Sequence, residues 1–300
     1  MKKESKIFVI IVTYKGMRWY DKCFSSLRES TIPLQTVVVD NTPGNEDVEY
    51  IKTHYPEIHI IKTNENLGFG RANNLGMRYA LDNGCDYVFL LNQDTWIEPD
   101  AIDKLVKIAE EHPEYGIISP IHMNAAANHL NVMMEDGNHN YELLSDALFN
   151  RLRDAYTITY INAAAWLLPR KTLDTIGGFC PIIYHYGEDD DYMNRVHYHG
   201  LKMGLVPSSR IVHDCRVAVD LKEELFAKAN RENLDIFLNI NNTKSVKAWR
   251  RYFFWKWMKG ILCHENVEKY KEQYKVICAK QKEIEQCRAA HKIKQANWLQ

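Results

Sequence analysis

The sequence has few of the features that mark several special classes of protein. Its 300 residues include only 14 glycines and 9 prolines, with 46% hydrophobic and 26% charged residues, which excludes collagen-like and wholly disordered chains. Seven scattered cysteines form no C-x-x-C pair, so neither a disulfide framework nor a zinc knuckle is indicated. The apolar run Ile7 to Val12 is too short for a membrane span and lacks a signal-peptide layout. We therefore expect a cytoplasmic protein that is not exported.

The net charge of −1 hides two oppositely charged parts of the chain. Residues 244–300 carry 14 lysines and arginines against 5 glutamates, whereas residues 1–243 carry 24 basic against 34 acidic residues. A basic segment of this kind suits an anionic surface such as lipid headgroups. The excess of acidic residues in residues 1–243 has two possible explanations. These side chains either cover solvated faces, or some of them gather around a metal or a cationic transition state.

The first half of the chain alternates short apolar runs with helical patterns. Continuous apolar strands joined by helices are typical of a parallel sheet covered on both faces, which predicts an α/β core of the nucleotide-binding type. Helices are predicted around Trp19, Cys23 and Leu27, over Gly68–Leu81 and over Pro99–Glu111. The predicted strands are Ile7–Thr13, Thr36–Val39, His59–Lys62, Tyr87–Leu91 and one that begins at Ile117–Ser119.

The pattern becomes irregular over residues 124–154, which we interpret as an inserted hairpin or flap. Asp136-Gly137-Asn138 predicts a hairpin turn between strands over Val132–Glu135 and Tyr141–Leu144. The last 85 residues are predicted to be mainly helical. Regular elements before them are expected at Tyr160–Leu168, as a helix from Gly187 to about His199, and as two short strands, Met203–Val206 and Ile211–His213.

Polar residues stand where three of the predicted strands stop. The first strand ends in Val12-Thr13-Tyr14, the second in Asp40-Asn41 and the fourth in Asn92-Gln93-Asp94. Any one of these groups is as readily a turn or a helix cap. Ligands of parallel α/β sheets bind outside the carboxyl ends of the strands, so three such groups on one edge indicate a binding site.

Residues 66–74 contain a Gly-x-Gly sequence that differs from the dinucleotide-binding fingerprint. Asn73 replaces the final glycine, and the motif follows the third strand rather than the first, which argues against a nicotinamide-dependent dehydrogenase. Gly68 can be explained without a ligand, because a glycine lets the start of a helix pack closely against its neighbours. Arg71, at the same helix start, is a candidate for contact with a diphosphate or a base.

Four adjacent carboxylates, residues 188–191, stand at a predicted helix start. Acidic residues favour helix N-termini, so a solvated cap is one reading. The other is catalytic, because crowded carboxylates raise one another's pKa and provide a base near neutral pH. His213 closes a short strand before Asp214; alone it is more often structural, but beside Asp94 it is a candidate metal ligand.

Taken in order, these motifs resemble the family-2 glycosyltransferases of bacteria, and within them the rhamnosyltransferase-like enzymes that build cell-surface polysaccharides. The resemblance covers about residues 6–214 and implies the GT-A fold, a Rossmann-like, mainly parallel sheet with helices on both faces. The motifs are Ile10-Ile11-Val12-Thr13-Tyr14, Val37-Val38-Val39-Asp40-Asn41, Asn66-x-Gly68-Phe69 with Ala72-Asn73-Asn74, Leu90-Leu91-Asn92-Gln93-Asp94-Thr95, Gly177-Gly178-Phe179 and Tyr186-x-Glu188-Asp189-x-Asp191.

The resemblance implies an inverting transfer of a sugar from a nucleoside diphosphate donor to a hydroxyl of a glycan or lipid-linked acceptor. Asp189 would be the catalytic base, assisted by Glu188, while Asp94 and His213 would hold Mg²⁺ or Mn²⁺. Asp40 would accept a hydrogen bond from the base of the nucleotide. The residues expected to bind the nucleotide sugar are Val12, Thr13, Tyr14, Asp40, Asn41, Gly68, Arg71, Asn74, Asn92 and Gln93.

We expect a catalytic domain over residues 1–214 and a helical, basic and aromatic extension over residues 215–300. Within the catalytic domain, residues 1–121 would form the donor-binding half and residues 122–214 the acceptor half.

One residue departs from the family pattern. Asn92 replaces the first carboxylate of the D-x-D metal motif, and a neutral oxygen should weaken divalent binding, so we expect loose, diphosphate-dependent metal binding. This departure leaves open an alternative, a catalytically weak partner subunit that binds a nucleotide sugar. A nucleotidyltransferase is a third possibility, but the chain has no early Gly-rich, basic phosphate loop.

Residues 246–262 interleave aromatic side chains with lysine and arginine. Trp beside Lys or Arg suits a membrane surface, which predicts peripheral membrane contact. The competing interpretation is a helix packed on the catalytic domain or on a twin subunit in a homo-oligomer. No motif supports binding to nucleic acid.

Overall fold

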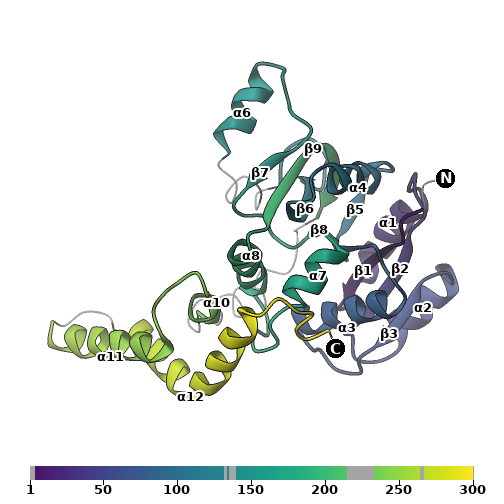
Figure 1. Cartoon of the computed structure of the whole chain (residues 1–300). Coiled ribbons are helices and arrows are strands. Elements are labelled where there is room, and N and C mark those ends of the chain that lie inside the picture. The colour runs from purple at the N-terminus through teal and green to yellow at the C-terminus, as the bar shows by residue number, and fades with distance from the viewer. Residues whose placement is uncertain (1–3, 132–133, 135–139, 215–232, 264–266, 300) are drawn as a thin grey trace.

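A mixed sheet with helices on both faces forms the centre of the molecule (Figure 1). This computed structural model describes residues 4–131, 134, 140–214, 233–263 and 267–299. The strands are β1 (Ile7–Thr13), β2 (Gln35–Asp40), β3 (His59–Lys62), β4 (Tyr87–Asn92), β5 (Thr95–Ile97), β6 (Tyr115–Met123), β7 (Tyr156–Ile158), β8 (Ala165–Pro169) and β9 (Lys202–His213).

The helices surround this sheet and continue beyond it at the C-terminal end. They are α1 (Met17–Arg28), α2 (Glu46–His54), α3 (Phe69–Asp82), α4 (Ala101–Glu111), α6 (Tyr141–Leu148), α7 (Arg170–Ile176), α8 (Glu188–Tyr198), α10 (Leu234–Leu238), α11 (Val246–Leu262) and α12 (Glu268–His291).

The strand order is β3-β2-β1-β4-β8-β6-β9-β5, and β7 pairs with β9. The first four strands of this order run parallel, and β6 is parallel to β9. β8 runs antiparallel to β4 and β6, and β5 runs antiparallel to β9. The predicted α/β fold, with a mainly parallel sheet and a helical C-terminal region, is therefore confirmed.

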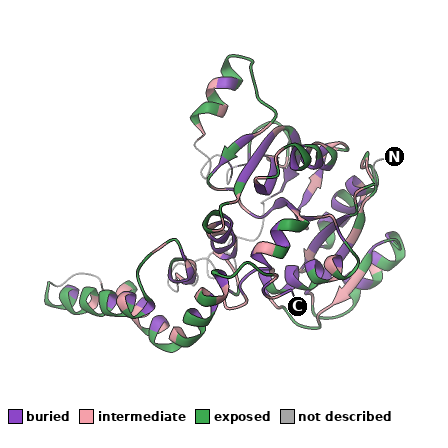
Figure 2. Cartoon of the chain, in the orientation of Figure 1, coloured by how far each residue is buried: buried purple, intermediate pink, exposed green. Residues whose placement is uncertain are grey.

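Strand β1 shows why the central strands are apolar throughout. Ile7, Val9 and Ile11 face the cluster formed with α1, α2 and α4, while Phe8 and Ile10 face the cluster formed with α3, α7 and α8. Successive side chains of a strand point to opposite faces, so a strand covered on both sides must be apolar at every position. The buried centre and exposed outer helices are visible in Figure 2.

The prediction for residues 124–154 is wrong in part. Tyr141–Leu144, expected to be the second strand of a hairpin, belongs to helix α6. Asn140 caps this helix, because its side chain accepts a hydrogen bond from the Leu143 backbone N–H at 2.9 Å. The predicted turn at residues 136–138 and most of its first strand lie outside the described residues.

The two short strands predicted at Met203–Val206 and Ile211–His213 are one irregular strand, β9. Its pairing with β6 shifts register, since Pro120 pairs with Val206 but Ile121 pairs with Arg210. Residues 207–209 form a bulge, and beyond it the strand turns toward β5. Strand β5, which the sequence pattern did not predict, pairs Thr95 with His213.

Helices α10, α11 and α12 share a third apolar cluster with Cys180 and Ile183 of the loop after α7. Arg288 of α12 holds the α10–α11 connection, because its guanidinium donates to the carbonyls of Phe237, Asn239 and Asn242. The C-terminal segment then returns to the catalytic sheet (Figure 1), where the Asn297 carbonyl accepts a hydrogen bond from Gly178 N–H.

Candidate active site

The carboxyl ends of β1 and β2 are held together by a buried carboxylate. Asp40 is fully buried and accepts hydrogen bonds from the Thr13 hydroxyl at 3.1 Å and the Thr42 backbone N–H at 3.0 Å. Lys62 pairs with its other oxygen at 2.6 Å. Three donors therefore contact Asp40, two at Oδ1 and one at Oδ2, so a nucleotide base would have to approach the less occupied Oδ2.

Gln93 fixes the backbone at the end of β1. Its side-chain oxygen accepts from Tyr14 N–H at 2.9 Å, and its amide nitrogen donates to the Tyr14 carbonyl at 3.1 Å. This reciprocal pair joins the ends of β1 and β4. Gln93 and Tyr14 thus lie together, with the Gln93 side chain bonded to the protein backbone. Contact of either residue with the nucleotide sugar stays a prediction.

Gly68 allows the loop before α8 to approach α3. It has a φ of +82°, and a Cβ there would lie 2.1 Å from the Tyr184 carbonyl oxygen, so no other residue fits without displacing the backbone. The Gly68 carbonyl accepts from the Asn41 side chain at 3.2 Å. Asn41 therefore links the end of β2 to the start of α3.

Arg71 and Asn74, predicted to bind the nucleotide sugar, contact the loop between α7 and α8. Arg71 donates to the Pro181 carbonyl at 2.8 Å. The buried Asn74 amide donates to the Phe179 carbonyl at 2.9 Å and accepts from Phe179 N–H at 2.7 Å. Both side chains thus position this loop, and a direct contact of either with the nucleotide stays a prediction.

Asp94 and His213 are neighbours. The antiparallel pairing of β5 with β9 brings His213 Nε2 to 3.4 Å from Asp94 Oδ1, and Asp214 N–H donates to the Asp94 carbonyl at 2.9 Å. Both side chains are largely buried. One carboxylate oxygen and one imidazole nitrogen at this spacing fit Mn²⁺, which accepts both donor types, and leave further positions for a diphosphate.

Asn92 contributes backbone contacts at the end of β4. Its N–H donates to the Ala164 carbonyl at 2.9 Å, and its carbonyl lies 4.0 Å from the Cys23 thiol. The side chain is half-buried. The carboxylate that the family pattern expects here is thus replaced by an amide beside Asp94.

The acidic start of α8 lies in a poorly solvated place, with Glu188 and Asp191 buried and Asp189 and Asp190 half-buried. Burial, and then the charge of Asp189, raise the pKa of Glu188 to about 8. Burial also raises the pKa of Asp189, although Ala163 N–H donates to its Oδ2 at 3.3 Å. Crowding in a poorly solvated site thus favours a shared proton, which is the condition for a base that works near neutral pH.

The Ala163–Ala164 segment, just before β8, connects the two halves of the site. Ala163 N–H bonds to Asp189, while the Ala164 carbonyl bonds to Asn92, two residues before Asp94. Chain segments far apart in the sequence therefore bring the carboxylate of α8 and the Asp94–His213 pair to the same short stretch of backbone. Each helix or strand end supplies one part of the candidate site.

Asp190 and Asp235 belong to the same acidic group, although sequence analysis assigned no role to Asp235. Burial raises the pKa of Asp190 to about 7, with further contributions from Asp189 and Asp235. Asp235 comes from α10 and lies against Gly187, whose Cβ position is 3.3 Å from the Asp235 Cβ. Nothing in the sequence near residue 235 signals this contact, because it depends on how α10 packs.

A family model described as "Glycosyl transferase family 2" matches residues 8–177, more than half of the chain. The matched region contains β1 to β4, the Asp94 motif and the α3 loop. The chain belongs to glycosyl transferase family 2. The predicted family is therefore confirmed, and the protein is a glycosyltransferase.

Two relatives from bacteria match most of the chain. An "N-acetylglucosaminyl-diphospho-decaprenol L-rhamnosyltransferase" of Mycobacterium tuberculosis is 24% identical over 237 residues, covering 68% of this chain and 75% of that protein. The "dTDP-rhamnosyl transferase RfbF" of Shigella flexneri is 21% identical over 219 residues, covering 70% of this chain and 69% of that protein.

Solved structures of TarS from S. aureus share the fold. TarS 1–349 in complex with UDP-GlcNAc superposes with a TM-score of 0.57 at 12% identity, covering 89% of this glycosyltransferase and 78% of that chain. A longer TarS chain gives a TM-score of 0.54, and the present chain spans 40% of its length. The likeness thus extends past the catalytic sheet.

The raised pKa of Glu188 predicts a pH-dependent stability. The folded protein keeps this proton up to about pH 8, whereas the unfolded chain releases it near the ordinary value of 4.5. The wild type should therefore lose stability as pH rises between these values, by on the order of a few kcal/mol. Glu188→Gln removes this titration, so its stability relative to wild type should rise across the same window.

Urea denaturation at a series of pH values measures this difference, with Glu46→Gln on the exposed first turn of α2 as the control. A stability difference between Glu188→Gln and wild type that stays constant from acid to pH 8 would contradict a raised pKa for Glu188.

Proposed function

We propose that this glycosyltransferase moves a sugar from a nucleoside diphosphate donor to an acceptor hydroxyl with inversion, in the synthesis of a cell-surface polysaccharide. The observation that carries the proposal is the Ala163–Ala164 segment, which bonds to the Asp189 carboxylate on one side and to Asn92, next to the Asp94–His213 pair, on the other. A donor sugar between these groups would have a base on one side and the metal ligands on the other.

Asp94 and His213 would hold Mg²⁺ or Mn²⁺ against the donor diphosphate. When bound, the metal would stabilise the negative charge that develops on the leaving oxygen. Because Asn92 adds no charge, these two side chains leave the cation with only one protein carboxylate, and the diphosphate would supply the rest.

Asp189 would act as the general base. The acceptor oxygen forms a bond to the anomeric carbon while the bond from that carbon to the diphosphate breaks and its electron pair leaves with the nucleoside diphosphate. The acceptor proton passes to Asp189, and attack from the face opposite the leaving group inverts the anomeric centre. Glu188, whose own pKa is raised by burial and by the charge of Asp189, would position Asp189.

The alternative of a catalytically weak partner subunit is less well supported. The buried carboxylate pair and the Asp94–His213 pair are both present, and the named relatives are transferases. The relatives' names also suggest a rhamnosyl donor, and the Mycobacterium tuberculosis protein is named for a diphospho-decaprenol acceptor. We therefore propose a lipid-linked acceptor for the present enzyme.

Helix α11 offers a surface suited to such an acceptor's membrane. One stripe, including Trp249 and Phe253, is buried against the other C-terminal helices. The rest of the helix exposes apolar side chains, with Trp255 68% and Leu262 79% exposed. None of the described helices is long and apolar enough to cross a bilayer. The exposed apolar side chains beside lysine and arginine support a position of α11 along the membrane surface.

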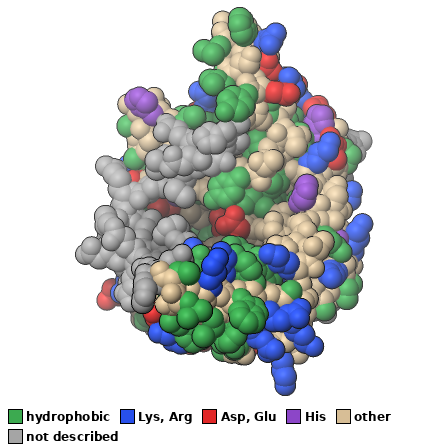
Figure 3. All heavy atoms as spheres, turned by 90° about the vertical axis from the view of Figure 1, so that its left-hand side faces the viewer, with side chains coloured by type: hydrophobic (Ala, Val, Ile, Leu, Met, Phe, Trp, Pro, Cys, Tyr) green, Lys and Arg blue, Asp and Glu red, His purple; other side chains and the backbone are tan. Residues whose placement is uncertain are grey.

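Charge complementarity identifies the proposed occupant of this surface as an anionic lipid headgroup layer. Residues 246–262 contain five lysines and arginines and no acidic residue. Figure 3 shows hydrophobic and basic side chains side by side on the lower part of this face, with acidic side chains above them near its centre. Each cation near an anionic surface contributes about 1 kcal/mol, which adds to the insertion of exposed aromatic rings.

Replacing the base should abolish transfer and spare donor binding. For Asp189→Asn we expect turnover to fall by about 10²–10⁴-fold, because the acceptor proton loses its destination. Release of UDP or dTDP from candidate donor sugars measures turnover, and thermal shift with the nucleotide and Mn²⁺ measures binding. Asp190→Asn is the matched neighbour and should lower turnover far less. Near wild-type turnover in Asp189→Asn would remove Asp189 from this role.

Replacing Asp94 should change the Mn²⁺ concentration that the enzyme needs for activity. In Asp94→Asn, the only carboxylate of the proposed metal pair becomes neutral, so the Mn²⁺ concentration for half-maximal activity should rise by about tenfold or more. Titration of Mn²⁺ at a fixed donor concentration measures this half-maximal concentration. Asp100→Asn, a half-buried residue before α4, is the control. An unchanged Mn²⁺ requirement, or full activity in the presence of a chelator, would contradict the assignment.

Membrane contact should depend on the exposed side of α11. Trp255→Ser combined with Leu262→Ser should reduce co-sedimentation with anionic vesicles by about tenfold, whereas Ile293→Ser, an exposed apolar residue outside α11, should not. Raising the salt concentration should weaken the binding of the wild type. Failure of the wild type to bind anionic vesicles, together with a concentration-dependent dimer that the double variant loses, would favour a twin subunit instead.

A further inference from the structure

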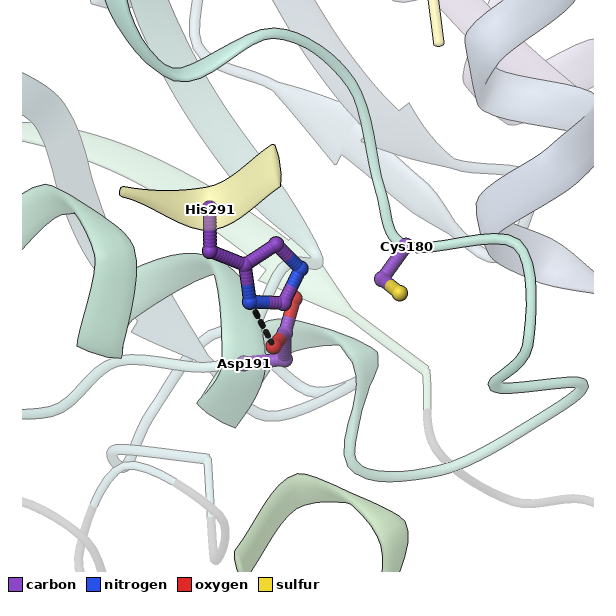
Figure 4. A group of neighbouring side chains, drawn as sticks. All are labelled: Cys180, Asp191 and His291. Carbon is purple, nitrogen blue, oxygen red and sulfur yellow. Dashed lines mark ion pairs between the residues drawn. The ribbon is translucent and has the colours of Figure 1, made fainter. Parts of the chain in front are cut away.

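A second cluster of potential ligands lies on α8, apart from the residues assigned to sugar transfer. Cys180 lies in the loop after α7, Asp191 in the first turn of α8 and His291 at the end of α12 (Figure 4). The Cys180 sulfur, an Asp191 carboxylate oxygen and a His291 ring nitrogen all lie within 4.8 Å of one another. Three segments far apart in the sequence therefore bring donors of three types to one point.

Cys287 supplies a fourth donor. It precedes His291 by one turn of α12, so the two side chains share a face of that helix. The thiols of Cys180 and Cys287 share a hydrogen bond, and Cys287 is buried. The set is thus two sulfurs, one nitrogen and one carboxylate oxygen.

Asp191 and His291 are buried with part of their hydrogen-bonding capacity unused. Asp191 is 0% and His291 1% exposed, yet Asp191 Oδ1 has no hydrogen-bond partner, and the Leu238 backbone engages at most one ring nitrogen of His291. Their closest approach, from Nδ1 to Oδ1, is 3.6 Å, which is longer than a hydrogen bond (dashed in Figure 4). Each unsatisfied buried group costs about 1–3 kcal/mol, and a bound cation would remove this cost.

Arg195 fixes the orientation of the Asp191 carboxylate. Its Oδ2 accepts a hydrogen bond from Arg195 Nε at 3.0 Å. Arg195 thereby orients the carboxylate so that Oδ1 turns to His291.

The formal charges around the cluster would be balanced by one divalent cation. When Cys180 and Cys287 bind a metal as thiolates, they and Asp191 carry three negative charges, and Arg195 supplies one positive charge. A divalent ion would make this buried group neutral, which a buried site requires. Arg195 is itself 1% exposed and donates to the Ile176 carbonyl.

We propose that Cys180, Asp191, Cys287 and His291 form a tetrahedral Zn²⁺ site that fastens α12 to α8. Sulfur and imidazole ligands favour zinc, whereas the oxygen-rich surroundings of Asp94 and a diphosphate favour Mg²⁺ or Mn²⁺. Zn–N and Zn–S bonds of about 2.0 and 2.3 Å place ligand pairs roughly 3.3–3.8 Å apart. Side-chain movements of about 1 Å would bring Cys180, Asp191 and His291, now within 4.8 Å of one another, to that spacing. Cys287, hydrogen-bonded to Cys180, would complete the set by turning its thiol to the same point.

The site would have a mechanical consequence for the catalytic helix. Asp191 lies two residues after Asp189 on α8, and Cys180 belongs to the loop that Asn74 and Arg71 hold. Zinc would thus tie the C-terminal extension to both the helix and the loop that shape the carboxylate pair. Metal binding of this type adds to folding free energy.

Metal analysis of the full chain tests the proposal. Protein produced with added zinc, then dialysed against a weak chelator, should retain about one zinc per chain by elemental mass spectrometry. Cys287→Ser and His291→Gln should each retain less than about a tenth of that amount. Cys278→Ser is the matched control, because it changes an exposed cysteine on the same helix and should keep its zinc.

A second measurement needs no variant and covers the case in which the variants fail to fold. Replacing zinc with Co²⁺ in the wild type should give the absorption of thiolate-to-cobalt charge transfer and of tetrahedral cobalt. Asp94→Asn should show the same spectrum, since the zinc site is independent of the transfer metal. A wild-type protein that binds no zinc and gives no thiolate–cobalt band, or that contains a Cys180–Cys287 disulfide in its place, would overturn the proposal.

Discussion

Partial or full burial of adjacent carboxylates at the start of α8 is the constraint on which the candidate active site depends. Charges taken out of water must be hydrogen-bonded, paired or protonated. Each member of the group meets this requirement differently. Asp189 accepts from Ala163 N–H, Asp191 pairs with Arg195, and Glu188 takes up a proton. The surrounding loops must stay close for this balance to hold, and a base with a raised pKa results.

The loops that enclose these carboxylates are held mainly by backbone contacts. Asn74 bonds to both polar groups of Phe179, and only glycine at position 68 lets the Tyr184 carbonyl approach α3. Polar side chains at the strand ends, such as Gln93 and Asn41, likewise bond to backbone groups. Many polar residues of the family motifs therefore build the shape of the site, while fewer remain available to touch a donor.

The C-terminal helices belong to the same physical unit as the acidic helix. Asp235 of α10 raises the pKa of Asp190, His291 of α12 faces Asp191, and Leu299 joins the apolar cluster of the sheet. A division of the chain at residue 214 stays a prediction about domains. Described residues beyond that point pack around the carboxylates proposed to be catalytic, while one side of α11 stays exposed.

The sequence by itself determined the α/β sheet and its order of elements, since apolar strands such as β1 must be covered on both faces, and its ordered motifs identified the family. It also marked Asp94, His213, Glu188 and Asp189 as candidates, because strand ends and helix starts are local features. Only the tertiary structure decided that Tyr141–Leu144 is helical, that β9 is continuous, and that Cys180, Asp191, Cys287 and His291 meet. Those outcomes depend on packing between distant segments, which no local pattern encodes.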